Sequence, residues 1–158
     1  MKKEGNRLQM IFVLYVLIII RLIVFKYPYS ELKEIADSWQ KNVILEGLDT
    51  ANFTPFKTIR MYIRYYDRLN SFENLFGNIL IFIPYGYLLP AAFRKYRNFL
   101  LFFSGTFLFV TGIEVFQLFS AFGAFDVDDF ILNCFGSCIG YVLFWAAEKW
   151  RSHKKQVY

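Results

Sequence analysis

The chain has 158 residues, of which 56% are hydrophobic, 22% aromatic and 20% charged. Its many aromatic residues exclude a disordered chain, and two cysteines inside one apolar run exclude a disulfide-rich scaffold. The net charge of +5 is typical of nucleic-acid-binding proteins, but membrane topology explains it better here, and we expect no nucleic-acid partner. A mean hydropathy of +0.34 is too high for one small soluble domain.

Four apolar stretches, residues 8–25, 75–93, 99–119 and 130–147, approach the length of about 20 residues that a transmembrane helix needs. The first is interrupted only by Arg21, near its end, where a long side chain can reach the lipid headgroups. We interpret this stretch as an uncleaved anchor rather than a signal peptide, because no small-residue cleavage site follows it. The sequence therefore predicts an all-α, polytopic membrane protein, a four-helix bundle that forms one membrane domain over residues 1–158.

The segments outside the spans differ in charge, and basic segments stay in the cytoplasm. Bases dominate the N-terminal tail (Lys2, Lys3, Arg7), the turn after the second span (Arg94, Lys95, Arg97) and the C-terminal tail (Lys149, Arg151, Lys154, Lys155). The turn after the third span instead holds Asp126, Asp128 and Asp129, and the segment 26–73 balances bases with acids. We therefore expect cytoplasmic N and C termini, with the segment 26–73 and the aspartate turn outside.

Residues 58–70 of the outer segment show the periodicity of an amphipathic helix. Arg60, Arg64 and Arg68 recur every four residues, and apolar residues occupy the opposite face. Such a helix lies on the outer leaflet. Two interpretations stay open: a cap over the bundle with solvated arginines, or contact with anionic lipid or a lipid-linked phosphate.

Polar side chains from three spans fall at one depth, close to the aspartate turn. Glu114 and Gln117 belong to the third span, Asn78 to the second and Asn133 to the fourth. Hydrogen bonds between helices explain a single asparagine. A glutamate within a membrane needs a partner, and the candidates are Arg21 and a divalent cation.

Four short motifs follow one another along the chain. They are Asn-x-x-Pro-Phe at 52–56, the stretch 78–86, Glu-x-x-Gln at 114–117, and the aspartate-rich stretch 126–133 followed by Gly136 and Gly140. In this order they resemble the motifs of the VanZ-like family over residues 52–141. Many members of that family carry an arginine three residues before the first aspartate, where this chain has Gly123. Any role of that arginine is absent here or taken by Arg60, Arg64 or Arg68.

The resemblance implies a bacterial cell-membrane protein of the envelope, and the family's namesake is associated with low-level teicoplanin resistance. We expect an outer polar site formed by Glu114, Gln117, Asp126, Asp129, Asn133, Asn78 and Asn52, with lipid or ligand contact at Arg60, Arg64 and Arg68. No cofactor is expected, apart from a candidate divalent cation at Glu114, Asp126 and Asp129.

Three functions stay open. The first is a non-catalytic protein whose outer site binds or shields a lipid-linked or lipidated ligand and lowers the access of teicoplanin-type glycopeptide antibiotics. The second is an enzyme acting on a lipid-linked envelope substrate, with Glu114 and Asp126 or Asp129 as acid, base or metal ligand. The third is a purely structural helix bundle.

Overall fold

The computed structural model describes residues 2–39, 43–65 and 71–157. In chain order the elements are α1 (Lys2–Ile23), α2 (Tyr29–Asp37), α3 (Val43–Thr50), α4 (Lys57–Arg64), α5 (Ser71–Ala92), the 3₁₀ helix η1 (Arg94–Arg97), α6 (Phe99–Ser120) and α7 (Val127–Val157). Within these residues, four helices are long and apolar enough to cross a membrane: α1, α5, α6 and α7. The predicted all-α fold with four spans is therefore confirmed.

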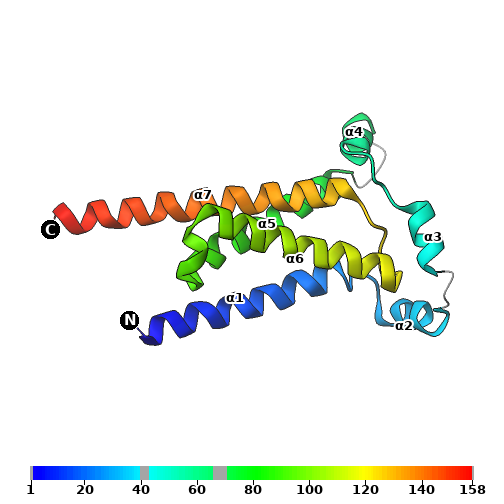
Figure 1. Cartoon of the computed structure of the whole chain (residues 1–158), viewed down its shortest axis with the longest axis horizontal. Coiled ribbons are helices and arrows are strands. Elements are labelled where there is room, and N and C mark those ends of the chain that lie inside the picture. The colour runs from blue at the N-terminus through cyan, green and yellow to red at the C-terminus, as the bar shows by residue number, and fades with distance from the viewer. Residues whose placement is uncertain (1, 40–42, 66–70, 158) are drawn as a thin grey trace.

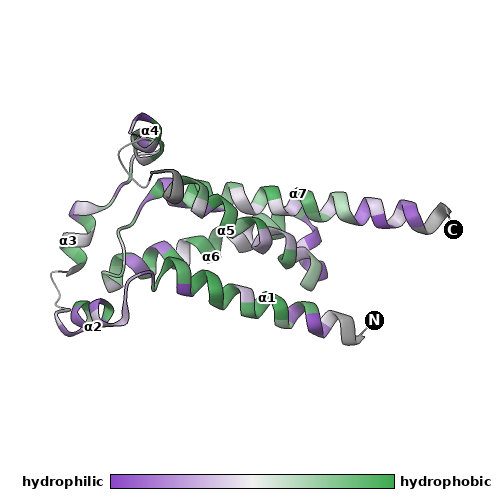
Figure 2. Cartoon of the chain, turned by 180° about the vertical axis from the view of Figure 1, so that it is seen from behind, coloured by the Kyte–Doolittle hydropathy of each residue, from purple (hydrophilic) through white to green (hydrophobic). Residues whose placement is uncertain are grey.

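The four long helices run along the long axis of the molecule, and the two ends of the chain lie at the same end of it (Figure 1). Apolar residues dominate the middle of the bundle, and polar residues gather toward both ends (Figure 2). We call the end that holds η1 and both termini the terminal end. The opposite end, which holds residues 24–39, 43–65 and 121–129, is called the loop end.

Helices α5 and α7 pack backbone to backbone through glycine. A Cβ atom added at Gly86 of α5 would lie 2.0 Å from the carbonyl oxygen of Ser137, and one added at Gly140 would lie 2.0 Å from that of Ile83. Gly136 meets the carbonyl oxygen of Ile79 in the same way. Small residues let membrane helices approach this closely. The seam fixes the register of α7 on α5 and so positions the first turn of α7 beside Asn78.

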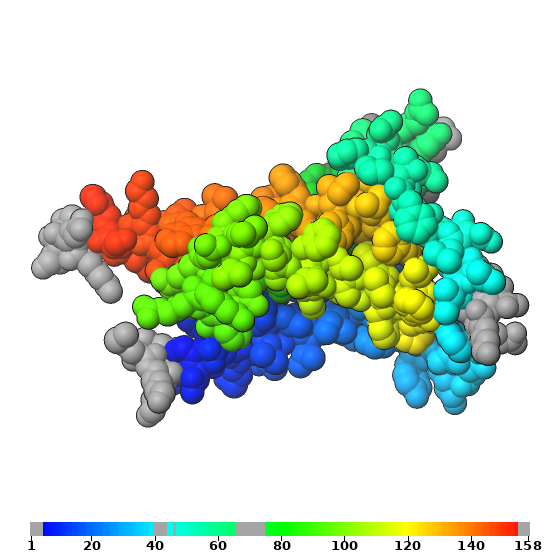
Figure 3. All heavy atoms as spheres, in the orientation of Figure 1, coloured from blue at the N-terminus to red at the C-terminus, as the bar shows by residue number. Residues whose placement is uncertain are grey.

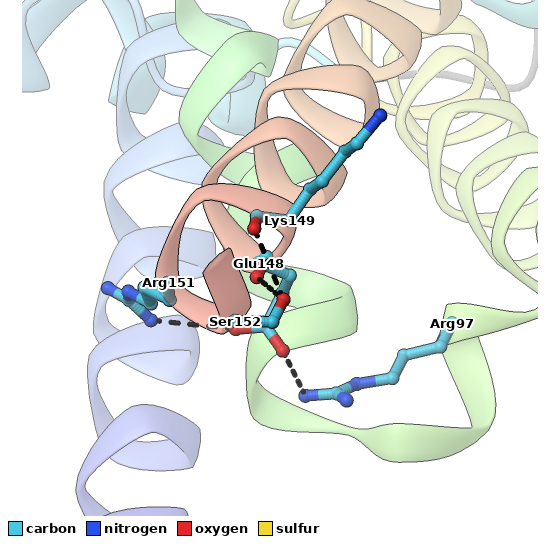
Figure 4. Close-up of polar contacts among 5 residues, drawn as sticks. All are labelled: Arg97, Glu148, Lys149, Arg151 and Ser152. Atoms are coloured by element: carbon cyan, nitrogen blue, oxygen red, sulfur yellow. Dashed lines mark hydrogen bonds and ion pairs between the residues drawn. The ribbon is translucent and has the colours of Figure 1, made fainter. Parts of the chain in front are cut away.

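The terminal end is closed by contacts between η1 and α7 (Figure 4). The guanidinium of Arg97 lies 3.7 Å from the Glu148 carboxylate and 5.2 Å from the Phe144 ring. The Tyr141 hydroxyl donates a hydrogen bond of 2.6 Å to the Arg97 carbonyl. The basic turn and the basic C-terminal tail, which the charge pattern assigns to one side of the membrane, thus lie together.

The short helices α2, α3 and α4 lie across the loop end (Figure 1). The Trp39 indole, just after α2, donates to the Phe119 carbonyl near the end of α6 at 2.9 Å. The amphipathic helix predicted over residues 58–70 is present as α4, which begins one residue earlier and ends at Arg64. Arg68 lies outside the described residues.

Candidate functional site

Asp126 caps the helix that follows it. Its Oδ1 accepts a hydrogen bond of 2.8 Å from the Asp128 amide, in the first turn of α7. Amides in the first turn of a helix have no partner within the helix, and an aspartate before the helix is a favoured acceptor for them. Asp126 therefore has a structural role that its residue type and position explain.

Asp128 is fully buried and caps a different helix, α4. Its carboxylate accepts hydrogen bonds from the backbone amides of Phe56, Thr58 (2.7 Å) and Ile59 (3.1 Å). A negative charge at a helix N-terminus is also favoured by the helix dipole. Asp128 thus joins the start of α4 to the start of α7, although the two helices are far apart in sequence.

Asn52 completes this connection. Its backbone amide donates to the Phe125 carbonyl at 2.9 Å, and its carbonyl accepts from the Val127 amide at 3.0 Å. Its Nδ2 donates to Asp126 Oδ1 at 2.8 Å, and the Thr58 hydroxyl donates to Asp126 Oδ2 at 2.6 Å. We call Asn52, Thr58, Asp126 and Asp128 the clasp, because together they hold the stretch before α4 against the start of α7.

The clasp also holds an exposed aromatic ring in an unusual backbone conformation. Phe56, just before α4, has a φ of 64° in the left-handed region, and half of its surface is exposed. This region is unfavourable for bulky residues with a Cβ. The hydrogen bond that the Phe56 amide donates to Asp128 holds the residue there.

A second group of polar residues lies on the bundle side of the clasp. Glu114 of α6 is only 1% exposed, and its Oε2 accepts a hydrogen bond of 3.1 Å from the Asp126 amide. Asp129 of α7 accepts one of 2.6 Å from Nδ2 of Asn78 on α5. Lys26, just beyond α1, interacts electrostatically with both carboxylates. All four long helices thus contribute to this group or lie directly next to it.

Asn133 is the residue of this region whose hydrogen bonding is incomplete. It lies one turn after Asp129 on α7 and is 1% exposed. Neither its Oδ1 nor its Nδ2 has a hydrogen-bond partner within the described part of the chain. An unsatisfied buried polar group costs about 1–3 kcal/mol, so stability alone does not explain an amide here.

Arg21, a candidate partner of Glu114, and Gln117, a predicted member of the same polar site, both bind backbone carbonyls near the end of α1. The Arg21 guanidinium donates to the Phe25 carbonyl, and within the described residues it forms no ion pair with Glu114. Gln117 donates to the Ile23 carbonyl at 3.3 Å and so connects α6 to the end of α1. The Glu114–Arg21 pair is therefore not formed within the described residues.

The structure offers no preformed metal centre in the residues it describes, where no group of three or more His, Cys, Asp or Glu side chains converges. The candidate cation site at Glu114, Asp126 and Asp129 lacks the required geometry. Both carboxylate oxygens of Asp126 already accept hydrogen bonds from the clasp. Carboxylate oxygens in that arrangement hold α4 rather than a cation.

Arg60 and Arg64 lie on the exposed side of α4. Together with Lys57, Met61, Ile63 and Tyr65 they line a hollow of about 540 Å³. Met61, Ile63 and Tyr65 are large apolar side chains that stay exposed beside these cations. In Figure 1, α4 projects sideways from the bundle, past the start of α7. This mixture of exposed cations and apolar groups suits a lipid headgroup region.

Sequence reasoning missed Thr58 and Lys26 and did not select Asp128 from the aspartate turn. An aspartate in a first helical turn is a recognisable signal for capping, but the turn it caps is set by tertiary contact. Lys26 was counted only as one charge among many in the segment 26–73. Its relation to Glu114 depends on how α1 packs beside α6.

Comparisons with known proteins agree with this architecture. The family model described as VanZ/LLP1 matches residues 12–148. Protein VanZ of Enterococcus faecium is 29% identical over 142 residues, which cover 90% of this chain and 76% of that protein. No solved structure matches significantly. With a match over most of its length and four long apolar helices, the chain belongs to the VanZ/LLP1 family and is a multi-pass membrane protein.

Proposed function

We propose that this protein lowers the susceptibility of a bacterium to teicoplanin-type glycopeptide antibiotics, by binding a lipid-linked or lipidated envelope ligand at the loop end. In this proposal both termini are cytoplasmic and the loop end faces outward. Glu114, Asp129 and Asn133 bind the ligand, and the clasp holds the surrounding segment in place. Family membership, and the position of the buried Glu114 and Asn133 and the half-buried Asp129 at one end of the bundle, support the proposal.

The observation that carries it is the unsatisfied amide of Asn133. In the clasp, each polar side chain has partners that account for its presence. Asn133 has none in the described residues, and it lies one turn from a carboxylate that is itself bonded to a neighbouring helix. An asparagine within a membrane helix is usually explained by hydrogen bonds to a neighbouring helix. This explanation does not apply to Asn133, whose side chain has no such bond in the described residues.

A second candidate function is supported by the pair Glu114 and Asp129. These carboxylates come from α6 and α7 and share the electrostatic influence of Lys26. Two acidic groups in different environments can divide the roles of general acid and base. Turnover of a lipid-linked substrate by the purified protein, lost in both Glu114→Gln and Asp129→Asn, would favour an enzyme over a binding protein.

Deletion and overexpression test the main proposal. Minimum inhibitory concentrations are measured for teicoplanin and for a panel of other envelope antibiotics, with protein abundance in the membrane fraction measured in parallel. Overexpression should raise the concentration needed for teicoplanin, and deletion should lower it. Equal susceptibility in all strains at confirmed expression would contradict the proposal.

The proposed orientation has a separate test. A reporter fused after Tyr158 should behave as cytoplasmic, and a cysteine introduced at Phe53, which is exposed at the loop end, should react with a membrane-impermeant thiol reagent in whole cells. A reporter that behaves as extracellular would reverse the orientation.

A further inference from the structure

An apolar groove separates α1 from α6 in the loop-end half of the bundle. It has a volume of about 430 Å³ and is lined by Ile20, Val24 and Phe25 on one side and by Leu108, Gly112 and Phe116 on the other. This volume falls within the range of about 300–1,000 Å³ found for ligand pockets. On the face seen in Figure 3, α1 and α6 run side by side. At the loop end, the hydrogen bond from Gln117 to the Ile23 carbonyl connects the two helices.

Gly112 keeps the groove open. A Cβ atom added at this position would meet no atom within 4 Å, whereas one added at Gly86 or Gly140 would collide with backbone. Gly112 therefore has no packing partner that requires a glycine. Its effect is to leave space in the wall of α6, facing Val24 and Phe25, which directly follow α1.

The chemistry of the lining indicates a hydrocarbon chain. The lining consists of aliphatic and aromatic side chains and one glycine. The groove lies within two helices that are long and apolar enough to cross a membrane. An occupant that enters from the bilayer and fills such a space is an acyl chain.

Two cations next to Phe25, a lining residue, indicate the headgroup. The Arg21 guanidinium donates to the Phe25 carbonyl, and Lys26 directly follows Phe25 in the sequence. Both side chains are exposed. A phosphate is the natural partner of an arginine and a lysine in a headgroup region.

We propose that this groove binds one acyl chain of an anionic glycerophospholipid, with the lipid phosphate at Arg21 and Lys26. The bound lipid forms part of the wall of the protein between α1 and α6. The inference does not depend on a role in antibiotic susceptibility. It assigns a lipid site to a groove whose lining overlaps the four sequence motifs only at Phe116.

Lipid retention by the purified full-length protein tests the proposal. The protein in mild detergent is incubated with equimolar phosphatidylglycerol and phosphatidylcholine of identical chains, and bound lipid is identified by native mass spectrometry. Two cations near the headgroup should favour phosphatidylglycerol about tenfold. Equal retention of the two lipids by the wild type would overturn the proposal.

Three variants test the apolar groove and the two flanking cations separately. Gly112→Leu fills the groove and should abolish the retained lipid, whereas Gly77→Leu, which also has open space around the added side chain but lies on α5, should keep it. The double variant Arg21→Gln with Lys26→Gln should retain lipid without preferring phosphatidylglycerol. Unchanged retention in Gly112→Leu, or unchanged preference in the double variant, would contradict the assignment.

Two further readouts complete the experiment. Thermal unfolding of each variant confirms that it is folded. If Gly112→Leu does not fold, the lipid preference of the variant with both Arg21→Gln and Lys26→Gln tests the proposal. A polyprenyl phosphate is added in competition. Its displacement of phosphatidylglycerol at equal concentration would contradict the choice of a glycerophospholipid, whereas a failure to compete supports it.

Discussion

Asp128 accepts a hydrogen bond of 2.7 Å from the Thr58 amide, and this contact joins two helix starts that are 70 residues apart in sequence. The bond belongs to a set of three from the first turn of α4 to one buried carboxylate. The three aspartates of the turn therefore have different roles. Asp126 and Asp128 hold α4, whereas Asp129 faces Asn78 within the bundle.

Asp128→Asn should loosen α4. The amide keeps one acceptor oxygen but loses the charge and half of the accepting capacity, so at least one backbone amide of α4 loses its partner. We expect a loss of about 1–3 kcal/mol in the free energy of unfolding. Thermal unfolding measures this loss, and trypsin should cleave faster at Lys57, Arg60 or Arg64. Glu148→Gln, at the terminal end, serves as a control, and a cleavage rate that rises equally in both variants would contradict the clasp.

Gly140→Ala should disrupt the seam between α5 and α7. The added methyl group would lie 2.0 Å from the Ile83 carbonyl oxygen, and backbone cannot move aside as a flexible side chain can. Overpacking of this kind typically costs about 1–3 kcal/mol, or more. Membrane abundance and thermal stability should both fall. Gly112→Ala is the matched control, because its methyl group meets open space, and it should leave both unchanged.

Gly123→Arg restores the arginine that is frequent in related sequences, and it should act through Gln117. A Cβ at Gly123 would lie 2.6 Å from Nε2 of Gln117, the movable end of that side chain. We expect the Gln117 side chain to shift and its hydrogen bond to Ile23 to break, at a cost of about 1 kcal/mol. A double-mutant cycle with Gln117→Ala checks this. Full additivity of the two effects on stability would show that Gly123 and Gln117 are not coupled.

Asn133→Leu should separate stability from function. Leucine has a similar shape and needs no hydrogen bonds, so the variant should be as stable as the wild type or more stable. If Asn133 binds a ligand, the same variant should lose the effect on teicoplanin susceptibility. Asn78→Leu is the comparison, because it removes the hydrogen-bond partner of the half-buried Asp129 carboxylate and should lower stability. An Asn133→Leu protein that is stable and fully active would remove Asn133 from the site.

Sequence reasoning recovered the parts of the fold that depend on local composition. Long apolar runs predict α1, α5, α6 and α7, because hydrocarbon tolerates few other structures. The small-residue pattern of Gly136 and Gly140 likewise predicts the close approach of α7 to a neighbour. The end of α4 at Arg64 was not predicted, because the apolar periodicity in the sequence continues past that residue.

The contacts within the site were harder to predict, because they are set by packing between distant segments. The depth of Glu114, Asn78 and Asn133 follows from the rise of a helix, and the structure does place them near one end of the bundle. Which aspartate meets which partner depends on the docking of Asn52 and α4. Arg21, one of the two candidate partners of Glu114, instead donates to the Phe25 carbonyl of its own segment, a local contact that the sequence pattern does not indicate.

Glu114→Gln tests the central claim of this account, that buried polar groups at the loop end carry the function. Glutamine keeps an acceptor oxygen for the Asp126 amide and removes the group that can lose or gain a proton. The measurement is the minimum inhibitory concentration of teicoplanin in a deletion strain that expresses the variant, at membrane abundance and thermal stability matched to the wild type. The account predicts a folded protein with susceptibility equal to that of the empty vector. A folded variant that protects as well as the wild type would contradict it.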